Sequence, residues 1–300
     1  MPRGARLAVS SRRLGPNKAM ENFLLRSIEE HSVVWVVISA GVGGVIGASL
    51  KYLFETVFAS RYQHRVAART MLRKYRFPLL RAADSLDKRL ENMIRFIDKH
   101  WYEDPDEDYY RLSTLYLFGS YLSWCKILED TAFLEFETSD RKARDFSIYF
   151  NRVFKSLTGF WYFTGSEIDG VEDATVPRLA LTAIGELMIK GAGQDSNEMP
   201  YILGFVEFTE KMKKSPEFEK WFGYLENAIL KDNDSSISSA RWNRLLVVAT
   251  MLRAFVAFLD PNSRQTAPRQ IHYLKRLDPK VAAKVREELD EMKIIGPLVS

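Results

Sequence analysis

Residues 32–50 read SVVWVVISAGVGGVIGASL, a run of 19 positions without a charged side chain. At about 1.5 Å of rise per residue, a helix of this length spans roughly 28 Å, which matches the hydrocarbon thickness of a bilayer. Trp35 lies near one end, and Lys51 and Tyr52 follow the other, where aromatic rings and amines meet lipid headgroups. The run therefore predicts one transmembrane helix over residues 32–50.

The alternative for this run is a buried core helix of a soluble protein. Its glycines argue against that alternative, because each glycine costs a helix in water about 1 kcal/mol relative to alanine. In lipid the backbone groups must be satisfied within the segment, so a helix is enforced and glycine is tolerated. The glycines concerned are Gly41, Gly43, Gly44 and Gly47.

Small residues recur along this run at a spacing of four. Ser39, Gly43 and Gly47 form one such series, and Ala40, Gly44 and Ala48 form another beside it. Small side chains allow two membrane helices to approach closely, so Ser39, Gly43 and Gly47 are candidates for helix packing in a homo-oligomer. The other interpretation is that small residues coincide by chance in a glycine-rich span.

The composition bounds the remaining chemistry of the 300-residue chain. With 46% hydrophobic residues it has material for a sizeable core, and its net charge of +4 is too small for a dedicated nucleic-acid binder. Cys125 is the single cysteine, which excludes a disulfide within the chain and fits a reducing compartment. No metal or cofactor is expected, because the histidines are not at ligand spacing: His31, His64, His100 and His272.

Residues 1–31 are expected to form an N-terminal tail. Residues 1–19 contain five bases and no acid. They fit a basic tail, a transit peptide, or a start codon placed too early so that Met20 begins the protein. The third interpretation fits best, because the sequence MENFLLRSIEEH leads directly into the span.

Residues 51–77 are expected to form a basic stalk helix. Six arginines and lysines lie between residues 61 and 76, against Glu55 as the one acid of the segment. The positive-inside rule therefore places the C-terminal domain in the cytoplasm. Lys51, Arg61 and Arg65 are candidates for contact with lipid headgroups. In an upright helix Arg69 would already lie about 28 Å beyond Leu50, outside the reach of headgroup charge.

Residues 78–300 are expected to form a soluble helical domain. Phe77–Pro78 predicts a helix boundary, because a residue before proline avoids the helical region. Residues 112–125 are uncharged but too short to span a bilayer, which indicates a buried core helix. The apolar run 245–259 contains Arg253, which would cost about 3 kcal/mol at a bilayer centre, so it too is assigned to the core. Further helix starts are predicted at Pro177, at Ser215–Pro216, at the serines of residues 235–239 and at Asp278–Pro279.

The predicted fold class is thus all-α, with one N-terminal transmembrane helix followed by a cytoplasmic multi-helix domain. Three stretches carry a resemblance to a known group. They are YRFPLLRAA at residues 75–83, STLY at residues 113–116 and AIGELM at residues 183–188. With these stretches the chain resembles an uncharacterised group of bacterial single-pass membrane-anchored helical proteins. The resemblance implies a short N-terminal anchor and a helical cytoplasmic domain, and it implies no activity.

One loop is dense in acids. Residues 165–173 read GSEIDGVED and follow the aromatic run FWYF at residues 160–163. Glu167, Asp169, Glu172 and Asp173 lack the alternation of a calcium loop. They are candidates for a docking loop, and the simpler interpretation is an exposed loop beside aromatic core residues.

The sequence therefore favours a membrane-tethered helical interaction or scaffold protein without a catalytic site. Its expected partners are membrane lipid, a protein and a second copy of the chain, with no nucleic acid. One alternative is a membrane-associated enzyme that uses an unrecognised site near residues 165–173. Another is an oligomeric membrane effector or pore subunit that assembles through the span.

Overall fold

The computed structural model describes Arg26 and residues 51–52, 59–97, 108–136, 141–190, 200–231, 235–268 and 270–292. The chain divides into two units, Met1–Gln63 and His64–Ser300, and the fold described here is that of the second. These residues are mostly helical, which confirms the all-α prediction. The predicted transmembrane helix over residues 32–50 lies outside the described residues.

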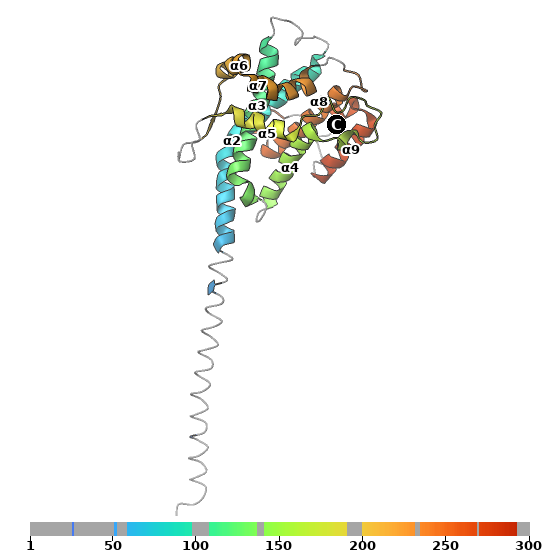
Figure 1. Ribbon diagram of the computed structural model, residues 1–300. Coiled ribbons are helices and arrows are strands. Elements are labelled where there is room, and N and C mark those ends of the chain that lie inside the picture. Colours follow the sequence, from blue (N-terminus) through green and yellow to red (C-terminus); the bar gives the residue numbers. More distant parts are fainter. Residues whose placement is uncertain are drawn as a thin grey trace, which may run out of the picture. The chain divides into compact units, whose positions relative to one another are not determined.

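Helices α2 (Ala59–Arg95) and α3 (Asp108–Phe136) lie side by side in opposite directions (Figure 1). The ring of Tyr75 in α2 is 6.4 Å from that of Trp124 in α3. Towards the other end of the pair, the Arg89 guanidinium lies 4.5 Å from the Tyr110 ring and donates to the Ser113 hydroxyl. The uncharged run at residues 112–125, which was predicted to be a core helix, lies within α3.

The helix boundary predicted at Phe77–Pro78 is wrong, because α2 continues through Pro78. A proline inside a helix removes one backbone hydrogen bond and costs about 3 kcal/mol. Here Tyr75, Leu79 and Leu80, on both sides of the proline, are buried in the core, and their burial offsets that cost. The packed unit thus includes residues that were predicted to belong to the stalk.

Helix α5 (Arg178–Met188) runs against α3, and Gly185 is where the two backbones meet. A Cβ atom on Gly185 would lie 2.9 Å from the carbonyl oxygen of Leu122. The helix ends at Met188. Strand β1 (Ile189–Lys190) follows and pairs antiparallel with β2 (Tyr201–Ile202), with Ile189 opposite Ile202.

Replacing Gly185 by alanine is expected to lower the free energy of unfolding by about 1–3 kcal/mol, because the new methyl group overlaps a backbone atom that cannot turn aside. Gly223 in α7 is the matched control, since a Cβ there meets nothing within 4 Å. Gly223→Ala should leave stability unchanged or raise it by up to about 1 kcal/mol, the helix propensity of alanine over glycine. Urea unfolding measures the free energy of unfolding of both variants. Equal losses of stability in Gly185→Ala and Gly223→Ala would contradict the close approach of the Gly185 and Leu122 backbones.

Helices α6 (Phe205–Lys214) and α7 (Pro216–Leu225) cover α3 and α5, and α7 continues into a π-helical turn, η5 (Glu226–Leu230). The start of α7 at Pro216 confirms the predicted start. Helix α6 was not predicted. Its core contact is Phe208, whose ring packs edge-on against Phe222 of α7 at 5.1 Å.

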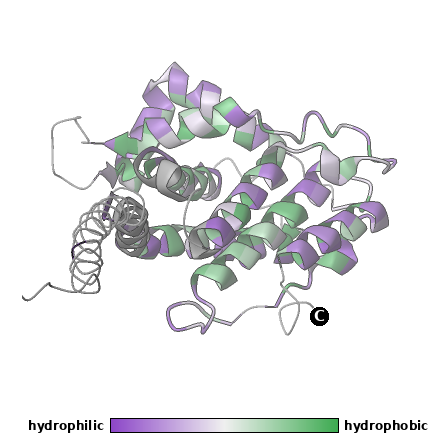
Figure 2. Ribbon diagram, turned by 90° about the horizontal axis from the view of Figure 1, so that it is seen from below, coloured by the Kyte–Doolittle hydropathy of each residue, from purple (hydrophilic) through white to green (hydrophobic). Residues whose placement is uncertain are grey.

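The other half of the unit contains α4 (Arg141–Thr158), α8 (Ala240–Leu259) and α9 (Pro279–Glu291), with short 3-10 helices η4 (Trp161–Phe163) and η6 (Tyr273–Arg276). Two predicted starts are confirmed by their caps. The Ser239 hydroxyl accepts from the Trp242 N–H, and the Asp278 carboxylate accepts from the N–H groups of Lys280 and Val281. Figure 2 shows hydrophobic and hydrophilic residues alternating along several helices of the unit, as expected of helices with one buried face.

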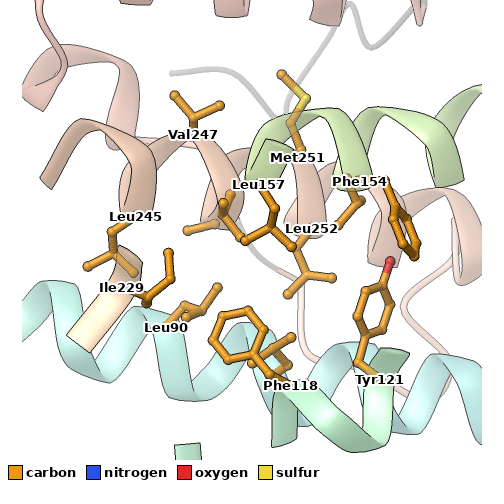
Figure 3. Packing of buried hydrophobic residues seen from close by; sticks show 14 of the residues in the cluster. Leu90, Phe118, Tyr121, Phe154, Leu157, Ile229, Leu245, Val247, Met251 and Leu252 are labelled. Carbon is orange, nitrogen blue, oxygen red and sulfur yellow. The ribbon is translucent and has the colours of Figure 1, made fainter. Parts of the chain in front are cut away.

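Helix α8 differs, because it is buried on all sides. Among the described residues it alone is long and apolar enough to cross a membrane, yet 89% of its apolar window is buried inside the unit. Its side chains meet those of α2, α3, α4 and η5 at the centre of the core (Figure 3). Leu90, Phe118, Leu157, Ile229 and Leu252 represent the five elements. The structure therefore agrees with the assignment of residues 245–259 to the core.

Candidate functional site

The loop between α4 and α5 carries the acidic residues predicted as a docking loop. Glu167, Asp169, Glu172 and Asp173 are all exposed, whereas Ile168 between them is buried. Gly165 and Gly170 have φ angles of 82° and 71°, which favour glycine, and they turn the chain before Glu167 and again between Asp169 and Glu172. The loop thus presents its acids to solvent while its apolar residues face the core.

Arg244 of α8 forms hydrogen bonds to this loop from the protein core. Its Nε donates to the carbonyl oxygen of Ala174 at 2.8 Å, and its Nη2 donates to the Thr175 hydroxyl at 2.7 Å. Its Nη1 donates to the carbonyl oxygens of Ser156 and Gly159, each at 2.8 Å. The guanidinium therefore joins the end of α4 to the end of the acidic loop.

Arg244 has no acidic partner among the described residues, so carbonyl and hydroxyl oxygens solvate its charge. Burial lowers the pKa of its guanidinium to about 10, opposed by the nearby Tyr162. The group is still charged at neutral pH. The ring of Phe163, 4.6 Å away, adds a cation–π contact. The Arg244 side chain is fully buried, so it has no exposed atom that could bind a ligand. Its role is therefore to stabilise the fold.

A second polar cluster joins α9 to α4. Glu288 of α9 is almost fully buried and forms ion pairs with Lys155, at 2.5 Å, and with Arg152. Arg152 also pairs with Glu291 one turn further along α9. The buried carboxylate is thus compensated by two cations of α4.

Tyr162 and Trp161 lie between these two clusters. The Tyr162 hydroxyl is fully buried without a hydrogen-bond partner in the described structure. Burial, reinforced by the charge of Glu288, raises its pKa far above the ordinary value, so the phenol stays protonated. The Trp161 ring is flanked by the ammonium groups of Lys155, at 4.1 Å, and Lys284, at 5.1 Å. Lys284 also donates to the carbonyl oxygens of Trp161 and Thr164.

Another buried ion pair joins α8 to α2. The Arg253 Nε lies 3.3 Å from the Asp87 carboxylate, and its Nη2 lies 3.1 Å from Glu91. Its Nη1 donates to the carbonyl oxygen of Gln270, and its guanidinium lies 4.8 Å from the Tyr273 ring. Burial raises the pKa of Tyr273 to about 12, although the charge of Arg253 opposes this shift. This cluster therefore fastens three elements of the core.

These clusters supply stability and no recognisable catalytic chemistry. Tyr162 is held protonated, and the Glu288 carboxylate is occupied by its ion pairs with Arg152 and Lys155. Across residues 59–97 and the other described ranges, no three His, Cys, Asp or Glu side chains gather to hold a metal ion. Sequence reasoning missed Arg244 and Glu288. The only signal for Arg244 was a charge inside the apolar run of residues 240–259.

The remaining predicted site residues lie at the N-terminal end of the chain. Ser39, Gly43 and Gly47 fall outside the described residues. Lys51 is helical and exposed, while Arg61 and Arg65 belong to α2 at positions where the structure describes only the backbone. The structure therefore leaves the predicted packing and headgroup contacts as predictions.

An aromatic surface forms where α3 and α6 begin. It comprises Tyr109, Tyr116, Phe205 and Val206. The Phe205 ring lies 5.8 Å from that of Tyr109 and 5.4 Å from that of Tyr116, edge-on to both. Tyr109 is 66% exposed and Val206 is 72% exposed. Tyr116 and Phe205 are half-buried against the core, so the surface is partly anchored and partly exposed. Aromatic and apolar side chains grouped in this way are typical of protein contact sites.

Comparison of the chain with protein-family models, with curated proteins and with solved structures finds no match in any of the three. The resemblance carried by residues 75–83 and the two other stretches therefore stays a prediction.

Proposed function

We propose that this protein is a helical interaction or scaffold domain tethered to a membrane by one transmembrane helix at residues 32–50. The observation that carries the proposal is the uncharged run itself, which has the length of a bilayer span. It belongs to the unit Met1–Gln63, whereas the core found among the described residues begins at Tyr75. The other apolar stretch of that length, α8, is accounted for by burial in the core.

The interaction part of the proposal is supported by the aromatic surface. The charges near it are paired within the chain: Arg111 binds Asp108 and Glu226, and Lys190 binds Glu207. Among the described residues the surface thus offers rings and methyl groups beside charges that are paired, which suits an apolar face of a protein partner. The cytoplasmic position of the domain follows from the bases after the span. Packing through Ser39, Gly43 and Gly47 would provide self-association.

Membrane fractionation tests the tether. The full chain should sediment with membranes and resist extraction by alkaline carbonate, and removal of residues 1–60 should release a soluble domain. The matched variant replaces Val37 and Val45 by arginine, each of which costs about 3 kcal/mol in a bilayer centre and should abolish carbonate resistance. The control replaces the same residues by leucine and should remain in the membrane. Full-length protein in the soluble fraction would refute the tether.

A further inference from the structure

Helix α2 carries bases at a spacing of seven: Lys74, Arg81, Lys88 and Arg95. Seven residues are two helical turns with a drift of about 20°, so the four bases lie on one face over roughly 31 Å. All four are exposed. Phe77 lies on the same face, between the first two bases, and is 56% exposed. These five residues are called the basic stripe below.

Two acids of α2, Asp84 and Glu91, follow Phe77 at the same spacing of seven, so they lie beside the stripe. Residues 59–95 contain only three acids, and none is exposed: Asp84 and Asp87 are buried and Glu91 is half-buried. Asp87 pairs with Arg253 in the core. The sequence of α2 is therefore strongly basic, and folding concentrates that charge on the solvent side.

The charge is least compensated at the N-terminal end of the stripe. Lys88 pairs with Asp84 at 2.6 Å and Arg95 with Glu91 at 2.9 Å, each pair along the helix. Lys74 and Arg81 form no ion pair with any of the described residues. The Lys74 ammonium lies 5.2 Å from the Tyr75 ring. The exposed phenyl ring of Phe77 thus lies between two cations that have no acidic partner there.

We propose that the basic stripe of α2 binds the surface of an anionic lipid bilayer. Bases attract acidic headgroups by about 1 kcal/mol each near such a surface, and an aromatic ring inserts among headgroups at the same depth. A second copy of the same stripe is a poor occupant, because like charges would face each other. A lipid surface is also the nearest available partner, because the predicted span ends at residue 50 and α2 begins nine residues later, at Ala59.

This inference rests on the proposed tether and adds an orientation to it. In an upright helix Lys74 and Arg81 would be farther from the headgroups than Arg69, which already lies beyond the range of their charge. Contact therefore requires α2 to lie along the membrane. The interaction domain would then be held close to the surface, with its position dependent on acidic lipid.

An environment-sensitive fluorophore at residue 77 tests the contact in the full chain. The variant Phe77→Cys can be labelled selectively, because the native Cys125 is completely buried. The labelled protein is reconstituted in vesicles of phosphatidylcholine alone or with phosphatidylserine, and insertion is verified by carbonate extraction. The emission should shift to shorter wavelength only with phosphatidylserine. High salt, or Lys74→Glu with Arg81→Glu, should abolish the shift.

Two matched controls separate the stripe from general surface effects. A fluorophore at Leu179→Cys, an exposed residue of α5, should not respond to phosphatidylserine. The charge variant Lys213→Glu with Lys220→Glu, on exposed positions of α6 and α7, should keep the shift at residue 77.

The outcomes distinguish this inference from the tether. Carbonate-resistant protein without a phosphatidylserine-dependent shift overturns the lipid contact and leaves the tether standing. Protein that fails to insert but shifts with phosphatidylserine overturns the tether and supports the stripe. A shift without phosphatidylserine that grows with protein density would overturn the lipid contact. If replacing Glu167, Asp169, Glu172 and Asp173 by neutral residues then removed this density-dependent emission shift, the partner bound to the basic stripe would be the acidic loop of a second copy of the chain.

Discussion

Replacement of Arg244 by alanine is expected to lower the free energy of unfolding by about 3 kcal/mol or more. The substitution leaves the carbonyl oxygens of Ala174 and Ser156 buried without their donors, at about 1–3 kcal/mol each. It also opens a cavity beside Phe163. Relief of the buried charge offsets only part of this loss. Urea unfolding measures the effect on stability.

The same variant should loosen the acidic loop. A glutamate-specific protease should cleave after Glu167 or Glu172 faster in Arg244→Ala than in the parent. Arg244→Lys should also lose stability, because an ammonium cannot reproduce the planar fork that reaches four oxygens. Arg286→Ala, on the exposed side of α9, is the control and should change stability by less than about 0.5 kcal/mol. An Arg244→Ala protein as stable as that control would show that the guanidinium does not hold the loop.

Replacement of Asp87 by asparagine is expected to cost about 3 kcal/mol, because it leaves the Arg253 charge buried beside only one carboxylate. Both side chains are inaccessible to solvent, and Glu91 alone remains to compensate the guanidinium. Removal of one partner of a buried pair typically costs 3–5 kcal/mol, so the remaining contact places the effect at about the lower end.

A double-mutant cycle isolates the pair. Arg253→Met should destabilise on its own, and the double variant Asp87→Asn with Arg253→Met should lose clearly less than the sum of the two single variants, since no cation is left buried without its partner. Additive losses measured by urea unfolding would mean that the two groups are not coupled. In that case each residue would contribute only through its own packing.

Local signals in the sequence located several helices correctly. The starts of α7 at Pro216, of α8 after Ser239 and of α9 after Asp278 were all predicted. A cap is an interaction between residues at most three positions apart, so it can be read without knowledge of the fold. The burial of residues 245–259 of α8 was also predicted, since Arg253 marked an otherwise apolar run as unsuitable for lipid.

Interactions between distant residues account for the errors. The proline at residue 78 predicted a helix end, but the side chains of Tyr75, Leu79 and Leu80 are buried by other elements, and that burial keeps α2 continuous. Arg76, predicted to be a stalk residue, donates to the carbonyl oxygen of Leu259 at the end of α8. No local pattern distinguishes such an arginine from one in solvent.

The sequence by itself determined that the described part of this protein is all-α, where α5, α7, α8 and α9 begin, and that the chain contains an uncharged run of bilayer length. Periodicity, caps and composition are properties of short segments, and they suffice for these conclusions. Only the tertiary structure decided which charges are buried. Arg244 bonds to oxygens 69 to 88 residues away and Arg253 to a carboxylate 166 residues away. A buried charge is stable only where the fold brings its partners within hydrogen-bond distance, and those distances depend on how whole helices pack.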